Sequence, residues 1–304
     1  GGAGGQIVFT VSVNGSGVVS LDQQRAIVHT PNSGADQESS LGAANLIRLT
    51  ATITDKDGDS TSATLNLGEA ISFRDDGPSI SAGVATADSL QVDETSLSTN
   101  ASTSFAGAFT GSYGTDGAGT TTYALGVSSA GVDSGLDDSA TGSNILLYNE
   151  AGVIVGRVGG AGGQVAFTVT VNGSGLVTLD QQRAIIHTPN SGADQESSLG
   201  AANLVQLTAT ITDKDGDSAT AQIDLGGKLT FLDDGPSITP CEDADIKLSV
   251  DETHLGVSDT SSITVSDLFT SHFGADGAGT LTYALSVIAG ASGLVDTATG
   301  HFAS

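Results

Sequence analysis

Two turns of this sequence carry three aspartates each at alternate positions, with a glycine between the second and the third. The two sets are Asp55, Asp57 and Asp59, and Asp213, Asp215 and Asp217. A sharp turn at the glycine can aim several carboxylates at one point, and Ca²⁺ takes about six to eight oxygen ligands. These turns are therefore predicted to bind calcium; the alternative is a solvated acidic turn without an ion. They are not EF-hands, because the sixth position is serine and the twelfth is not glutamate.

Further acidic residues stand where one unit of the sequence gives way to the next. Two Asp-Asp pairs each precede Gly-Pro, a combination that ends a strand and stiffens the exit. An Asp-Glu pair follows each of them further along the sequence. We expect these carboxylates, from adjacent units, to share calcium and fix the orientation of the units; an ordinary polar linker is the alternative. The candidates are Asp75, Asp76, Asp93, Glu94, Asp233, Asp234, Asp251 and Glu252, with Asp116 and Asp276 in oxygen-rich glycine turns.

The other polar residues disfavour zinc, copper and catalysis. Cys241 is the single cysteine, and the five histidines are scattered along the sequence, so a site of soft ligands is not expected. His29 and His187 each end a strand-like segment, where we expect a structural hydrogen bond. No nucleophile elbow, phosphate-binding loop or His-Glu-x-x-His motif occurs. The acidic pairs recur from unit to unit, unlike the two carboxylates of a glycosidase, so we do not expect an enzyme.

An internal repeat organises the whole sequence. Residues 3–67 and 161–225 agree at 52 of 65 aligned positions, and the shared motifs lie 158 residues apart, as from Asp55 to Asp213. The turn of Asp116 returns 160 residues later at Asp276, so two residues are gained in a loop before it. We expect the C-terminal part of one repeat at 1–88, a complete repeat at 89–246, and the N-terminal part of the next at 247–304. The array is expected to continue beyond both ends.

The elements that must position these acids are predicted to be short strands. Gln6–Val13, Leu46–Ile53 and Val153–Val158 are rich in apolar and β-branched residues and are bounded by turns of Gly, Asn and Asp. We predict an all-β fold, with tandem β-sandwich (Ig-like) modules in an elongated array and calcium-binding turns and junctions. A β-solenoid is the alternative, but the period is too long for one coil. Ser266–His272 is predicted as a short helix, with Ser266 as its N-cap.

Charge and cysteine content narrow the environment and the partners. With 35 Asp and Glu against 9 Lys and Arg, the net charge is −26, so neither nucleic acid nor membrane insertion is expected. Disorder is the other interpretation of high acidity, but the strand-like runs oppose it. One cysteine allows no intrachain disulfide, so metal ions are the expected staple of an extracellular fold. No stretch approaches the ~18 apolar residues of a membrane span, and no signal peptide is visible.

A set of motifs together resembles the long tandem repeats of giant RTX-type adhesins, which Gram-negative bacteria export by type I secretion. The motifs are Val-Asp-Glu-Thr, Tyr-Ala-Leu, Ser-Gly-Leu, Gln-Arg-Ala-Ile-Val-His, Thr-Asp-Lys-Asp-Gly-Asp-Ser, Phe-x-Asp-Asp-Gly-Pro-Ser-Ile and Phe-Gly-Ala-Asp-Gly-Ala-Gly-Thr at Phe273–Thr280. The resemblance covers essentially the whole chain. It implies calcium-stabilised extender repeats of a secreted, cell-surface protein, which project a distal binding domain for adhesion or biofilm formation. The nonapeptide repeats of RTX proteins are absent from this chain.

The sequence is compatible with two functions. The first is a structural spacer in which several Ca²⁺ ions make the units and their junctions rigid. The second is a calcium-dependent, lectin-like module, in which an ion in an exposed turn meets sugar hydroxyls. The expected partners are adjacent repeats of the same chain, with any host-cell or surface ligand bound through other domains of the parent protein. We expect the chain itself to be a monomer.

Overall fold

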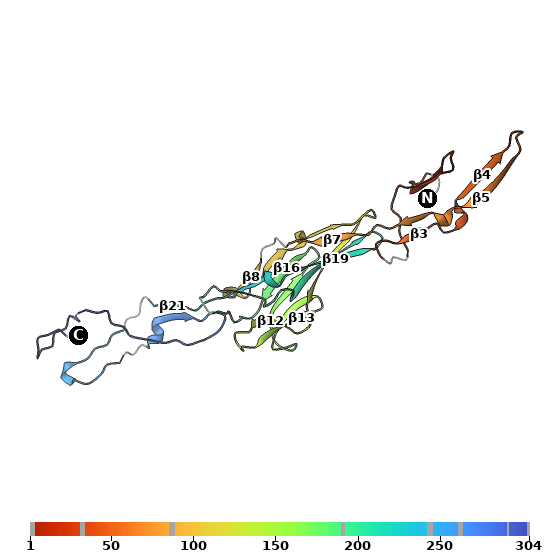
Figure 1. The fold of residues 1–304 in the computed structure, drawn as a ribbon. Helices are drawn as coiled ribbons and strands as arrows, with labels where there is room; N and C mark the ends of the chain where they lie inside the picture. Colours follow the sequence, from red (N-terminus) through yellow and green to blue (C-terminus); the bar gives the residue numbers. More distant parts are fainter. Residues whose placement is uncertain are drawn as a thin grey trace.

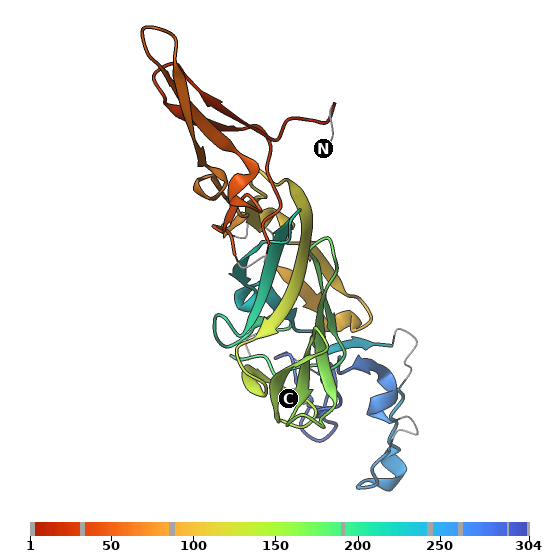
Figure 2. The same ribbon diagram turned by 90° about the vertical axis from the view of Figure 1, so that its right-hand side faces the viewer.

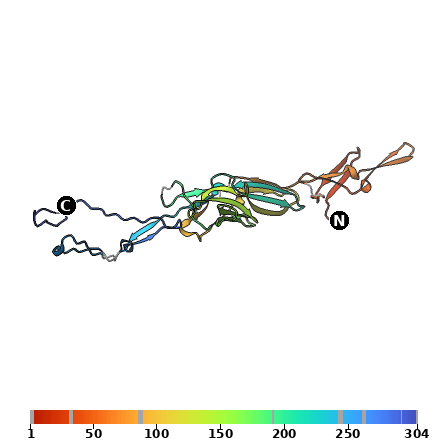
Figure 3. The same ribbon diagram turned by 90° about the horizontal axis from the view of Figure 1, so that it is seen from below.

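In a computed structural model the chain is a long all-β molecule whose parts follow one another along one axis (Figures 1 and 3). The two ends of the chain lie at opposite ends of the molecule, on either side of a central body. The helical segments among the described residues are short 3₁₀ turns. The structure describes residues 4–30, 34–84, 89–189, 192–241, 246–260, 264–290 and 292–302.

The central body is a sandwich-like arrangement of curled sheets around one apolar core. Its sheets run in the orders β12-β13-β14-β15-β16-β9, β11-β18-β19 and β17-β20-β8, and Figure 2 shows the long β11 beside β18. The core is built around Phe105, Phe167 and Phe231, all fully buried. The strands are β8 (Leu90–Asp93), β9 (Ala101–Ser104), β10 (Phe109–Ser112), β11 (Ala118–Val127), β12 (Val132–Asp137), β13 (Asn144–Glu150), β14 (Val153–Val158), β15 (Val165–Val171), β16 (Leu176–Gln181), β17 (Glu196–Ser198), β18 (Val205–Asp213), β19 (Ser218–Asp224) and β20 (Leu229–Leu232).

The first and last strands of the central body are neighbours and run in parallel. β8 pairs with β20 from Leu90 beside Leu229 to Asp93 beside Leu232. Because the two strands point the same way, the residues that follow them leave the sheet at the same end. Glu94 and Asp233, far apart in sequence, are therefore delivered to one place.

The first copy of the repeat forms the N-terminal end of the molecule (Figure 1). Its strands pair as β1-β2, β3-β6 and β4-β5, and Phe9 packs on Phe73 with ring centroids 5.0 Å apart, as Phe167 packs on Phe231 at 5.1 Å. The last strand, β7, pairs instead with β10 of the central body, so the exit from one copy lies on the next. The strands are β1 (Phe9–Val13), β2 (Val19–Gln23), β3 (Glu38–Ser40), β4 (Arg48–Thr54), β5 (Ser60–Asn66), β6 (Ser72–Arg74) and β7 (Ser79–Ala82).

Near-identical sequence is packed very differently in the two copies. Ile211 on β18 is 4% exposed, whereas its counterpart Ile53 on β4 is 71% exposed. The central body supplies β11 as a further neighbour of β18, while the β4-β5 hairpin is a sheet of its own. An isolated two-stranded hairpin is marginally stable in water, so the tertiary neighbours, not the local sequence, make the core.

The C-terminal part repeats one contact of the central body. β21 (Ser237–Pro240) pairs with β22 (Phe269–His272), as β7 pairs with β10. The predicted helix at Ser266–His272 is wrong: Val265–Leu268 forms a 3₁₀ turn, and the rest is β22, because its backbone groups pair with β21. Among the residues described, no helix has the length and apolar character that a membrane span needs.

We expect Ile211→Ala to lower the free energy of unfolding of the central body by about 2–5 kcal/mol, because it removes a buried side chain. Ile53→Ala is the matched control and should cost less than about 0.5 kcal/mol, since that side chain is exposed. Urea unfolding followed by tyrosine fluorescence reports the central body, which holds Tyr113, Tyr123 and Tyr148. Equal losses in the two variants would contradict the difference in packing.

Candidate metal centre at the junctions

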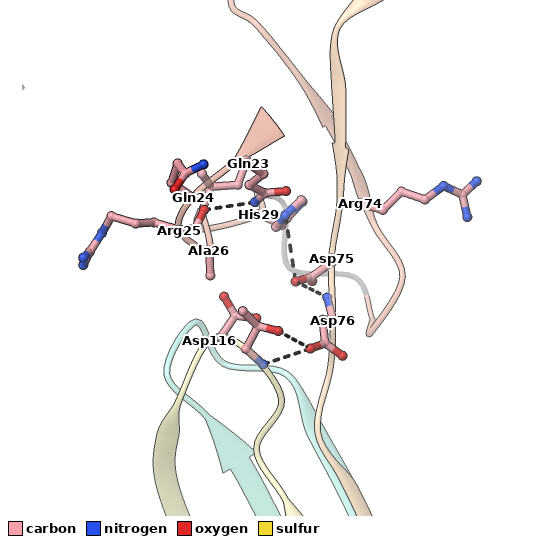
Figure 4. Close-up of a pocket in the computed structure, with 11 residues that line it drawn as sticks. Gln23, Gln24, Arg25, Ala26, His29, Arg74, Asp75, Asp76 and Asp116 are labelled. Carbon is pink, nitrogen blue, oxygen red and sulfur yellow. Dashed lines mark hydrogen bonds and ion pairs between the residues drawn. The ribbon is translucent and has the colours of Figure 1, made fainter. Parts of the chain in front are cut away.

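Acidic residues from two copies of the repeat meet between the first copy and the central body. Asp75 follows β6 of the first copy, Asp116 lies in the turn between β10 and β11, and Asp215 lies in the turn between β18 and β19. One ligand atom of each lies within 4.8 Å of the others, and Asp213, Asp215 and Asp217 form a second such group. Figure 4 shows Asp116 facing Asp75 and Asp76 across this junction.

Three of these carboxylates are buried with one oxygen left without a hydrogen-bond donor. The Asp75 side chain is 1% exposed, and Asp213 and Asp217 are 4% and 3% exposed. One oxygen of each, Oδ2, has no hydrogen-bond partner. Arg25 and Arg74 line a pocket of about 250 Å³ together with Asp75 and Asp116, and both arginine side chains point away from these two acids (Figure 4). Burial of unpaired charge is strongly unfavourable, so this arrangement calls for a cation or for protons.

Asp138 shows how the same fold treats a carboxylate with a purely structural role. It is fully buried, and Arg183 donates to both of its oxygens, at 2.6 and 3.0 Å. Thr141 donates to it as well, through its backbone N–H and its hydroxyl. No such arginine reaches Asp75, Asp213 or Asp217 within the described part of the chain. Unlike Asp138, these three junction acids have no arginine to neutralise their charge within the described residues.

The turn that carries the three alternating aspartates is built in the same way in both copies. Asp213 Oδ1 accepts from the N–H groups of Gly216 and Asp217 at 3.1 and 2.8 Å. Asp55 Oδ1 accepts from Gly58 and Asp59 at 3.1 and 2.9 Å. Asp55, Asp57 and Asp59 also lie within ligand distance of one another, but all three are exposed, at the tip of the β4-β5 hairpin. The conformation of the turn is therefore set by its local sequence, whereas the burial of its aspartates depends on the neighbouring parts of the fold.

The acids of the first junction raise one another's pKa. Burial, then the adjacent carboxyl of Asp75, then the charges of Asp75, Asp215 and Asp213 raise the pKa of Asp217 to about 6. Burial, then contact with the carboxyl of Asp215, raises the pKa of Asp213. Burial, then the charges of Asp215 and Asp75, raises the pKa of Asp116. When these carboxyl groups are ionised, their negative charges repel one another, and a bound divalent cation would offset this repulsion.

A second acidic cluster lies between the central body and the C-terminal part. Glu94, Asp233, Asp234 and Asp276 have ligand atoms within 4.8 Å of one another. Glu94 is buried, and its Oε1 accepts from Gln181 Nε2 at 2.8 Å and from the N–H of Ile185 at 2.9 Å. Its other oxygen, Oε2, has no partner, and burial raises its pKa.

Asp76 and Asp234 bind the backbone of the following unit directly. Asp76 Oδ2 accepts from the N–H and the hydroxyl of Thr115, at 2.9 and 2.5 Å. Asp234 accepts from the N–H of Ala275 at 3.0 Å. Each copy is thus hydrogen-bonded to the turn that carries Asp116 or Asp276, which places that aspartate in the junction.

The remaining candidates occupy other positions. Asp93 and Asp251 cap 3₁₀ turns by accepting from the N–H groups of Thr95 and Thr253, and neither they nor the exposed Glu252 joins an acidic group within the described ranges. Glu94 lies beside Asp233 of its own unit, because β8 and β20 run in parallel and each residue directly follows its strand.

Sequence reasoning missed the place of histidine in these clusters. His187 Nε2 lies 3.3 Å from Glu94 Oε1, and its Nδ1 lies 3.0 Å from Ser197 Oγ. Burial lowers its pKa, but the hydrogen bond and charge of Glu94 outweigh this, so the net shift is upward. The recurrence of Gln-Arg-Ala-Ile-x-His in both copies was the available signal. His29 holds the corresponding place, 3.9 Å from Asp75 Oδ1.

The chain belongs to a family described as a domain of unknown function, DUF5801, which matches residues 1–68, 89–226 and 247–302. The second and third matches begin at 89 and 247, the same 158 residues apart as the motifs of the repeat. Comparison with curated proteins and with solved structures finds no match.

In chelator, the raised pKa of Asp217 predicts that the stability of the folded chain decreases as the pH rises from about 4 to about 6. The pKa of Asp217 rises on folding, from 3.8 to about 6, so between these values the folded state binds more protons than the unfolded state. The contribution of Asp217 to the free energy of unfolding therefore falls as the pH rises through this window. Asp217→Asn should remove that fall and raise the melting temperature at pH 7 by a few degrees, where one kcal/mol corresponds to about 2–4 °C. Thermal unfolding between pH 4 and 7 measures it.

Asp59→Asn removes the exposed counterpart of Asp217 and is the control, with little change expected at any pH. If Asp217→Asn in chelator lowered the melting temperature at pH 7, the acid would be stabilising as it stands. The claim that its charge is uncompensated would then be wrong.

Proposed function

We propose that this chain is a run of structural extender repeats whose junctions are made rigid by divalent cations, calcium foremost. The observation that carries the proposal is the convergence of carboxylates from two adjacent repeats, among them the buried Asp75, whose Oδ2 has no hydrogen-bond partner. Asp75 of one copy meets Asp116 and Asp215 of the next. An ion bound there would be held by both copies at once and would oppose bending between them.

Each junction of the chain displays a different part of one set. Asp75 corresponds to Asp233 and Asp116 to Asp276 in the repeat. The first junction adds the β18-β19 turn of the following unit, and the second adds Glu94 and His187 of the preceding unit. A junction between two complete units would combine these contributions. One unit would supply the positions of Glu94, His187 and Asp233, and the next would supply the turns of Asp116 and Asp215.

The chemistry of this combined set favours calcium. Carboxylate oxygens predominate, which suits a hard cation, and calcium sites of extracellular modules bind at roughly 10⁻⁴–10⁻³ M. Such sites would be empty in a cytosol and filled outside a cell. A lectin-like role is less well supported at the junction, because the Asp75 side chain is 1% exposed and an ion that it held would offer little open surface to a sugar.

The repeat itself supports a spacer in preference to a catalyst. Corresponding acids, Asp75 and Asp116 at the first junction and Asp233 and Asp276 at the second, return in the repeat, and the chain is elongated, with its copies in a row (Figure 1). The motifs that resemble the extender repeats of RTX-type adhesins include these acids, as in Phe-x-Asp-Asp-Gly-Pro-Ser-Ile. In the proposed role, the array lies outside the bacterial cell and carries a distal adhesive domain away from the surface.

We expect calcium to make the molecule straighter and EDTA to make it flexible. Small-angle X-ray scattering at neutral pH should show a larger maximum dimension and less flexibility at millimolar calcium than in chelator. Asp75→Asn with Asp217→Asn should remove the part of this difference that arises at the first junction, where both acids lie, and leave the part from the second. Asp55→Asn with Asp59→Asn, in the exposed turn, is the matched control and should retain the whole difference.

Superimposable scattering profiles with calcium and with EDTA would overturn the spacer proposal. A calcium response that the exposed-turn variant lost and the junction variant kept would show that the ions act in the turns and not between the units.

A further inference from the structure

The junction at the end of the central body contains an imidazole as well as carboxylates. We propose that Glu94, His187 and Asp233 form a site for a divalent ion that accepts a nitrogen ligand, such as Mn²⁺ or Zn²⁺, beside the calcium positions. This deepens the function proposed above and rests on it, since the site belongs to the same junction. Ligand atoms of all three residues lie within 4.8 Å of one another.

The distances suit a small transition ion. His187 Nε2 lies 3.3 Å from Glu94 Oε1. Two ligands each about 2.1 Å from a metal are about 3.0–3.4 Å apart in octahedral or tetrahedral geometry, so the two side chains already lie near the spacing of ligands on one ion. Imidazole suits Zn²⁺ and related ions, whereas carboxylates also suit Mn²⁺, and a site of one imidazole with carboxylates fits this class better than calcium.

The surroundings already hold the ligands in place. Gln181 and the backbone of Ile185 occupy Glu94 Oε1, and the fully buried carboxylate leaves Oε2 without any partner. Ser197 Oγ bonds His187 Nδ1 at 3.0 Å, the kind of outer contact that fixes a metal-bound imidazole with Nε2 toward the ion. The side chain of His187 is 2% exposed.

A plain ion pair between a protonated His187 and Glu94 is the competing explanation. It would pair Nε2 with Oε1 but would leave Oε2 without a donor. In the first copy, His29 and Asp75, the counterparts of His187 and Asp233, have side chains 2% and 1% exposed, and His29 Nδ1 and Asp75 Oδ2 have no partner. Both copies thus place a buried histidine beside a buried carboxylate with one unpartnered oxygen, which favours a metal over one local ion pair.

An ion in this site would also connect the two ends of the module. Glu94 directly follows β8 and Asp233 directly follows β20, and these parallel strands are the first and last of the central body. A metal bound by both residues would connect the two strands just beyond their last paired residues, Asp93 and Leu232. A pulling force along the chain would then act on the metal–ligand bonds.

Pulsed electron paramagnetic resonance with Mn²⁺, in millimolar calcium, tests the inference on the full chain. In an H29Q background, which leaves His187 as the one buried histidine of the described residues, bound Mn²⁺ should show the coupling of a directly coordinated ¹⁴N. Adding His187→Gln should abolish that coupling and weaken Mn²⁺ binding at least about tenfold. Adding His272→Gln instead, at an exposed histidine, is the control and should change neither.

Bound Mn²⁺ without ¹⁴N coupling in the H29Q protein would overturn the inference, and this measurement needs no change at His187. An unchanged Mn²⁺ affinity in the folded His187→Gln variant would overturn it too. Either result with the calcium scattering response intact refutes the nitrogen-ligated site alone. A ¹⁴N signal without any calcium effect on scattering would refute the spacer instead.

Discussion

The structure depends on the cost of burying like charges next to one another. Asp75, Asp213 and Asp217 are nearly inaccessible to water, yet one oxygen of each has no donor. A carboxylate that the fold uses only for stability, Asp138, is satisfied by Arg183. Among the residues that the structure describes, no arginine or lysine neutralises these three junction acids, so under the proposed function their neutralisation depends on cations from solution. The proposed metal dependence follows from this imbalance.

The topology decides where the acids go. Because β8 and β20 are parallel, the start and the end of one unit contribute to the same junction. Because Asp76 and Asp234 bind the turns of the following unit, Asp116 and Asp276 are drawn in from the other side. β7, which belongs by sequence to the first copy, is paired with β10 of the next. Adjacent units therefore share backbone hydrogen bonds as well as acidic residues.

Local sequence patterns predicted the all-β class and most hairpins, because alternation and Asn-Gly turns act over a few residues. β1 and β2, for example, flank the predicted turn at Asn14 and Gly15. Sequence also singled out the junction aspartates. It could not place Glu94 beside Asp233, since a parallel pairing across more than a hundred residues leaves no local signal. Nor could it predict the burial of His187, or that Ile53 and Ile211, in the same local sequence, would have opposite exposure.

Titration calorimetry of the whole chain with calcium at neutral pH tests the central claim most directly. The account predicts uptake at roughly 0.1–1 mM, the range of extracellular modules, with a clear loss of bound ions when Asp75 and Asp217 are both replaced by asparagine. No uptake at millimolar calcium, by a chain whose circular dichroism shows an intact fold in chelator, would contradict it.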